Sequence, residues 1–219
     1  MFRSCYGCGF GYYSFKPDAR QHLYEVKVIN LTNGQPISPP GAILHDATYH
    51  AWAVGQAASE ALEMMAEGGD ASALVASQSS NPTFGSMAPI GPGGNQTFEI
   101  SSDEDATKTY LTVAGMLVNT NDAFSGVTGV SLDGLETGQM RTYNTHAYDA
   151  GTEKNDEIGS NLPGPAGGGE GFNATRDDNN PVVTLHGGIV SKDDGYAESA
   201  LSEAHRFDNA VMRIEVKRL

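Results

Sequence analysis

Carboxylates in two short segments are the residues of this 219-residue chain best suited to chemistry. Asp122 lies in a segment rich in turn formers that follows a strand-like run, and Asp149 and Glu153 lie in a second such segment. Gly151, between the two later acids, tolerates positive φ, so this segment can fold back and direct both carboxylates at one point. If the strands between the segments pair, Asp122 supplies a third carboxylate. Hard oxygen ligands of this kind suit Ca²⁺, which takes about 6–8 oxygens, although acidic turns also commonly lie in solvent.

Histidines form a second candidate group. His45, Asp46 and His50 are close in the sequence, and His186 follows a strand-like run. Together they could bind a transition metal, or they could hydrogen-bond the loop backbone around a nearby helical insert. His146 precedes the second acidic segment and could support a calcium loop from outside the ligand set.

The two cysteines, Cys5 and Cys8, lie in a glycine- and aromatic-rich N-terminal arm, residues 1–22. A Cys-x-x-Cys pair can be redox-active, half of a zinc site, or a small disulfide loop. No second cysteine pair completes a zinc site, and Gly9 rather than histidine follows the second cysteine, which disfavours covalent haem. In an oxidising compartment a Cys5–Cys8 disulfide, or a bridge between subunits, is favoured over catalysis. We predict that the arm docks on another subunit as an added edge strand.

Composition and motifs exclude several other classes of function. The net charge of −14 argues against nucleic-acid binding and against anionic membrane surfaces. No apolar run approaches the roughly 18 residues of a membrane span, and the first residues lack the apolar core of a signal peptide. Nucleophile-elbow, zinc-protease and dinucleotide-binding motifs are absent from the sequence. We therefore expect a non-enzymatic protein.

The elements that must position the carboxylates are mainly short strands. Residues 24–28 and 212–216 alternate apolar with charged side chains, the period-2 pattern of half-buried strands, and we expect them to be neighbours in one sheet. Further short strands are predicted at residues 98–100, 109–113, 127–132, 139–145 and 181–186. Many short strands separated by turn signals indicate an all-β fold, an antiparallel β-sandwich.

A small helical insert interrupts the strands. Ser59 can cap a helix that presents Leu62, Met65 and Ala66 on one face and ends at the glycine pair 68–69. Asp70 can cap a second short helix, and a helical turn is predicted near residues 197–204. The glycine-rich residues 159–180 indicate a long surface loop, without the lysine and serine or threonine of a phosphate-binding loop.

Several stretches resemble the spondin domain, the calcium-binding module of the matrix protein F-spondin, which also occurs as stand-alone bacterial proteins. The most specific is Tyr-Asp-Ala-Gly-Thr-Glu at 148–153, after Asn-Asp-Ala-Phe-Ser-Gly-Val at 121–127. Val-Ile-Asn-Leu-Thr-Asn-Gly-Gln-Pro at 28–36 and Ala-Val-Met-Arg-Ile-Glu-Val at 210–216 fit as well, so the resemblance runs from about residue 24 to 219. Glu153 stands where the animal domain has an aspartate, and its longer arm can still chelate.

The resemblance implies a spondin-like sandwich over residues 23–219, with Asp122, Asp149 and Glu153 as ligands of Ca²⁺. It also implies a secreted or cell-surface adhesion or assembly module. Its partner would be an extracellular or cell-surface protein or a polysaccharide, or the chain itself in a homo-oligomer or filament. Two alternatives stay open: a fibre subunit joined through the N-terminal arm, and a secreted redox or metal-handling protein using Cys5, Cys8 and the histidines.

Overall fold

A computed structural model describes residues 22–78, 81–86, 88–102, 108–208 and 210–219. Residues 1–21 of the N-terminal arm lie outside the described residues, and so do Cys5, Cys8 and their predicted disulfide. The predictions that the arm docks on another subunit, and that it is a unit separate from residues 23–219, therefore stay predictions.

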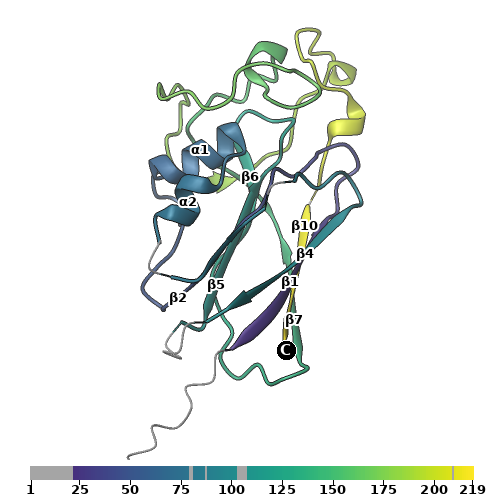
Figure 1. Ribbon diagram of the computed structural model, residues 1–219. Helices are drawn as coiled ribbons and strands as arrows, with labels where there is room; N and C mark the ends of the chain where they lie inside the picture. The colour runs from purple at the N-terminus through teal and green to yellow at the C-terminus, as the bar shows by residue number, and fades with distance from the viewer. Residues whose placement is uncertain (1–21, 79–80, 87, 103–107, 209) are drawn as a thin grey trace, which may run out of the picture.

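The described residues form ten strands and two short α-helices (Figure 1). The strands are β1 (Leu23–Asn30), β2 (Gly41–His45), β3 (Thr83–Gly85), β4 (Asn95–Ser101), β5 (Tyr110–Met116), β6 (Ala123–Ser131), β7 (Met140–Thr145), β8 (Ala147–Asp149), β9 (Thr184–Leu185) and β10 (Met212–Arg218). The helices are α1 (Glu60–Gly68) and α2 (Ser72–Ala76), with 3₁₀ turns η1 (Gly159–Asn161), η2 (Lys192–Asp194) and η3 (Glu203–His205).

The strands make two antiparallel sheets, in the orders β4-β1-β10-β7 and β3-β2-β5-β6-β8-β9. The first and last strands are neighbours, with Val26 opposite Val216 and Val28 opposite Ile214. The apolar faces of the two sheets enclose one core, in which Leu111 and all four of these paired side chains are fully buried. The antiparallel sandwich and the pairing of its terminal strands are thus confirmed.

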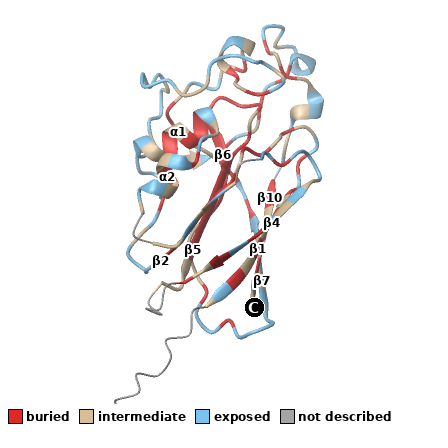
Figure 2. Cartoon of the chain, viewed as in Figure 1, coloured by how far each residue is buried: buried red, intermediate tan, exposed pale blue. Residues whose placement is uncertain are grey.

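The helical insert covers the outer face of the six-stranded sheet (Figure 1). Ser59 Oγ accepts a hydrogen bond from Leu62 N at 3.2 Å, and Gly69, in the left-handed region at φ 69°, ends α1. Leu62 and Met65 pack on this sheet and have no exposed surface, as the helical pattern predicts. Figure 2 shows this buried face of α1 in red. The six-stranded sheet is therefore buried on both faces in this region.

Three sequence-based boundaries were wrong. Residues 123–127 belong to β6 rather than to a turn, because they pair with β5 along one edge and, over residues 123–125, with β8 along the other. Only residues 184–185 of the predicted strand 181–186 are in a strand, and the helical turn predicted at 197–204 is a 3₁₀ turn at 203–205. His186 N donates to Ala147 O in β8, just beyond the two paired residues of β9, and the turn at 203–205 closes within itself through His205 N to Ser202 O.

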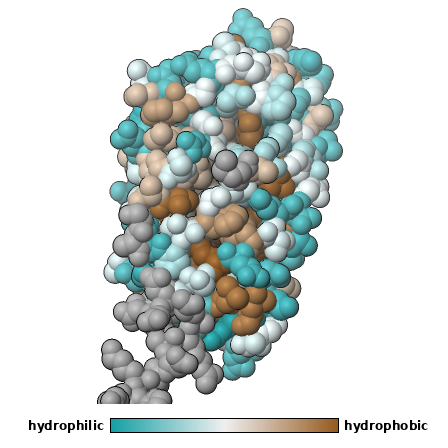
Figure 3. Space-filling view, in the orientation of Figure 1, coloured by the Kyte–Doolittle hydropathy of each residue, from teal (hydrophilic) through white to brown (hydrophobic). Residues whose placement is uncertain are grey.

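The surface carries its apolar side chains in scattered positions. Among the described residues the most exposed large ones are Val54, Leu185 and Met140, at 60%, 57% and 56%. Figure 3 shows brown patches interrupted by teal and white on the face in view. No helix in the described part of the chain is both long enough and apolar enough to cross a membrane.

Candidate metal centre

The pairing of β6 with β8 brings the two acidic segments together. Asp149 lies opposite Ala123 in this ladder, and Asp122 immediately precedes β6. Gly151 then turns the chain at φ 68°, and a Cβ there would lie 2.6 Å from the backbone N of Val182. The predicted fold-back around this glycine is therefore present, and it packs against a third segment.

Asp122 is fully buried and accepts hydrogen bonds from the backbone of the second acidic segment. Its Oδ2 accepts hydrogen bonds from Thr152 N at 2.8 Å and Glu153 N at 3.1 Å, and from the Thr152 hydroxyl at 3.2 Å. Its Oδ1 is buried without a hydrogen-bond partner. A buried carboxylate oxygen without a partner is costly, so this atom marks a place for a proton or a cation.

Asp149 is held by its own loop and by a side-chain relay. Its Oδ1 accepts from Gly151 N at 2.8 Å, and its Oδ2 accepts from Asn155 Nδ2 at 2.6 Å. His186 Nδ1 accepts from Gly188 N at 3.0 Å, so its Nε2 carries the proton and donates to Asn155 Oδ1 at 3.2 Å. Asn155 thus joins a buried histidine to Asp149.

Burial, together with neighbouring negative charge, raises the pKa of two of these carboxyls. Burial, followed by the charge of Asp149, raises the pKa of Asp122 to about 7 against the opposing effect of the amides that it accepts. Burial, followed by the charge of Glu67 and then those of Asp122 and Asp156, raises the pKa of Glu153 to about 8. Burial lowers the pKa of His186, while the Asp149 charge opposes that shift. Near neutral pH the site therefore favours a proton or a cation between these carboxylates.

The histidines are dispersed in the described structure. His45 Nδ1 donates to Asp46 O at 2.7 Å, and its Nε2 bonds the Thr112 hydroxyl at 2.9 Å, so both ring nitrogens are used within the fold. His186 belongs instead to the Asn155 relay. The interpretation that these side chains hydrogen-bond loops is confirmed for His45.

Within the described ranges, no set of three or more His, Cys, Asp or Glu side chains is arranged so that it could hold a metal ion. The chemistry of Asp122, Asp149 and Glu153 nevertheless fits calcium, because all three offer hard oxygens and Asp122 Oδ1 has no partner. Calcium at this centre would also draw on backbone carbonyls and water.

Sequence reasoning did not identify Asn155 as a part of this site, or Glu67 as a neighbour whose charge raises the pKa of Glu153. Asn155 lies two residues after Glu153, and no sequence pattern indicates a role for it. The position of Glu67 indicates only the polar face of a helix. Both act here through contacts between segments distant in the sequence.

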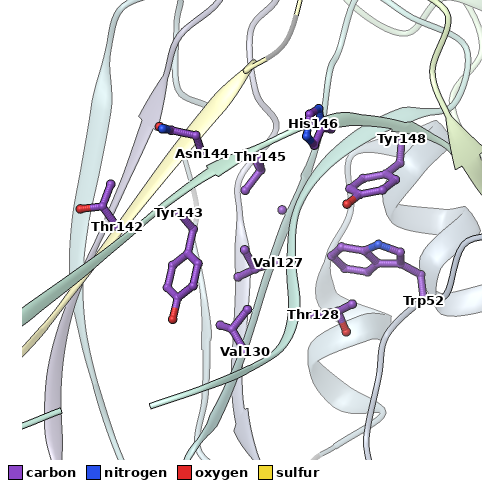
Figure 4. A pocket seen from close by; sticks show the side chains of 11 residues that line it. Trp52, Val127, Thr128, Val130, Thr142, Tyr143, Asn144, Thr145, His146 and Tyr148 are labelled. Carbon is purple, nitrogen blue, oxygen red and sulfur yellow. The ribbon is translucent and has the colours of Figure 1, made fainter. Parts of the chain in front are cut away.

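A groove lies near the acidic centre, where β6 continues beyond its pairing with β8. It has a volume of about 430 Å³ and is lined by Trp52, Tyr143, Tyr148, Asn144, His146 and several Thr and Val side chains. Figure 4 shows the Trp52 and Tyr148 rings on one side and Tyr143 with Asn144 on the other. Aromatic rings beside hydroxyl and amide groups make this groove both apolar and hydrogen-bonding.

The fold and these loops define a class of protein: an antiparallel two-sheet sandwich with a helical cover and an acidic loop cluster. The chain belongs to the spondin N-terminal domain family, whose model, Spondin_N, matches residues 38–161, more than half of the chain. This range contains Asp122, Asp149 and Glu153 and excludes β1 and β10. The chain matches no curated protein.

Proposed function

We propose that this chain is a non-enzymatic calcium-binding module of an extracellular or cell-surface protein, acting in adhesion or assembly. The observation that carries the proposal is the partnerless, fully buried Oδ1 of Asp122. The burial and the neighbouring negative charge that raise the pKa of Asp122 and Glu153 support it further. A divalent cation would relieve both, because it supplies positive charge and a ligand contact at the same place.

In this proposal Asp122, Asp149 and Glu153 hold the ion, and Asn155 orients Asp149. Bound calcium would supply charge neutralisation between the acidic loops. The chain's own contribution is to keep Asp122 at the centre through the amides of Thr152 and Glu153. Partner contact, with a protein or a polysaccharide, uses the aromatic groove lined by Trp52 and Tyr148.

Calorimetric melting with calcium and with a chelator tests the proposal. A ligand that binds only the folded state stabilises it by about 2.7 kcal/mol at a hundredfold excess over Kd. We expect the melting temperature to fall on chelation and Asp149→Ala to abolish that response. Asp133→Ala, an exposed aspartate in the turn after β6, should keep the full response. Identical melting curves with and without calcium would refute the proposal.

A further inference from the structure

A second group of carboxylates surrounds a cavity of about 270 Å³ beside the candidate metal centre. Glu67 comes from the last turn of α1 and Glu153 from the acidic loop, while Glu170 and Asp177 come from the long loop that lies beside α1 (Figure 1). Glu67 is buried, Glu153 is half-buried, and the last two are exposed. The cavity thus has an acidic floor built from two segments and an acidic rim built from one long loop.

Glu67 is the residue that points to a ligand. It is 1% exposed, its Oε2 accepts from Asn173 N at 2.9 Å, and its Oε1 is buried without a partner. It also lies at the C-terminal end of a helix, where the helix dipole disfavours negative charge. Burial raises the pKa of this carboxyl.

Glu63, one helical turn earlier, shows how the chain treats a comparable group. Its Oε2 forms an ion pair with Arg176 Nη2 at 2.5 Å. Within the described residues no such ion pair is found for Glu67, which borders the cavity instead. The two glutamates are four residues apart and lie on the same side of α1. They therefore differ in the groups that the neighbouring loop places opposite them. Each has one buried oxygen without a partner, but Glu63 is paired with a guanidinium, whereas Glu67 accepts a backbone N–H and borders the cavity.

The lining indicates which cation fits. It consists of carboxylate, amide and hydroxyl groups, with oxygen as the donor atom for a metal and no thiolate or imidazole. The carboxylates line the walls rather than converge, as the lack of a metal-holding set among the described residues also indicates. A cavity of this volume has room for several water molecules as well as an ion.

We propose that this cavity binds one hydrated divalent cation, Ca²⁺ or Mg²⁺, through Glu67 and Glu153, with Glu170 and Asp177 reached through water. The site is separate from the calcium centre at Asp122 and shares only Glu153 with it. Mg²⁺ characteristically keeps several waters and uses one or two carboxylates, as this lining allows.

Isothermal titration calorimetry of the metal-free chain, after removal of the chelator, with CaCl₂ and separately with MgCl₂ tests the site. The wild type should bind two divalent ions per chain in the calcium titration. Glu67→Gln should weaken one of them at least tenfold and change the other less than about threefold. Glu136→Gln, in the exposed turn before β7, is the charge-matched control and should match the wild type.

A rim variant keeps the test valid if Glu67→Gln does not fold. Glu170→Gln alters an exposed side chain and should weaken the same ion about three- to tenfold. Equal binding by the wild type and the variants that fold, or no binding at all, overturns the second site. A single ion lost in Asp149→Asn but kept in Glu67→Gln overturns this site and leaves the calcium centre standing. A single ion lost only in Glu67→Gln supports this site and overturns the calcium centre.

Discussion

Replacing Asp122 with asparagine separates the charge of this buried group from its shape. The substituted amide oxygen can accept the same backbone hydrogen bonds from Thr152 and Glu153 that the carboxylate accepts. The variant therefore imitates the protonated form of Asp122 at every pH. Without calcium, the comparison with the wild type measures what the ionised carboxylate costs the fold.

The sign of the effect follows from proton binding. Asp122 keeps its proton up to about pH 7 in the folded chain, whereas the unfolded chain loses it near 3.8. Between these values the folded state binds more protons, so stability falls as pH rises, by about 1.4 kcal/mol per pH unit. From pH 5 to pH 7 the loss is on the order of 2 kcal/mol. Glu153, with its pKa raised to about 8, changes stability in the same direction.

Other groups change in the opposite direction, so the difference between the two proteins is the useful quantity. Burial lowers the pKa of His45 and His186, and their contribution to stability is lost as pH falls below 6.5. Both proteins share these histidines, and their effect largely cancels in the comparison.

Urea unfolding of both proteins in chelator, from pH 5 to pH 8, provides the measurement. We expect the stability of the Asp122→Asn variant to rise relative to that of the wild type by on the order of 2 kcal/mol between pH 5 and pH 8. With saturating calcium the variant should be the less stable of the two, because it loses a ligand. A difference that stays constant with pH would refute the assignment of this cost to the ionisation of Asp122.

Two further predictions concern the strands of the sandwich and the aromatic groove. Gly126→Ala should cost at least about 3 kcal/mol of stability or prevent folding, because a Cβ would overlap the carbonyl oxygen of Val113. Gly85→Ala, where a Cβ meets nothing within 4 Å, should stay within about 1 kcal/mol in the same urea unfolding assay. Trp52 is the one tryptophan in the sequence, so its fluorescence reports on the groove, and we expect a saturable change on titration with dextran or chitosan. No change with either polysaccharide would contradict polysaccharide binding there.

The parts of the fold that the sequence predicts are those with one face in water. β1 and β10 alternate buried with partly exposed side chains, and α1 buries one stripe between its cap at Ser59 and its end at Gly69. In contrast, all five residues of β2 are buried, because the helices cover the outer face of this sheet. A strand buried on both faces loses its alternation, which is why β2 carries no period-2 signal.

The candidate site likewise has residues that the sequence predicts and residues that it does not. Gly151 and the acids around it form a contiguous motif, so their approach to Asp122 could be predicted once β6 and β8 were assumed to pair. The roles of Asn155 and Glu67 depend on contacts with residues 186 and 173, which reach the site through long loops. No local pattern encodes such contacts, and only the assembled fold reveals them.

The aromatic cluster behind the acidic loops bears on what an ion would do here. Phe124 lies 5.1 Å from Trp52 and 5.5 Å from Tyr148, measured between ring centroids, and these rings belong to the core beneath α1. Phe124 and Tyr148 are also opposite each other in the β6–β8 ladder, one register step from Asp149. The backbone that carries Asp122 and Asp149 is therefore fixed by packing and pairing that require no metal. Because these positions are fixed in advance, their mutual repulsion cannot be relieved by moving the strands apart, and it must be met by a proton or a cation. Calcium bound at the proposed centre would thus act on the charge of a preformed loop pair rather than on the formation of the sandwich.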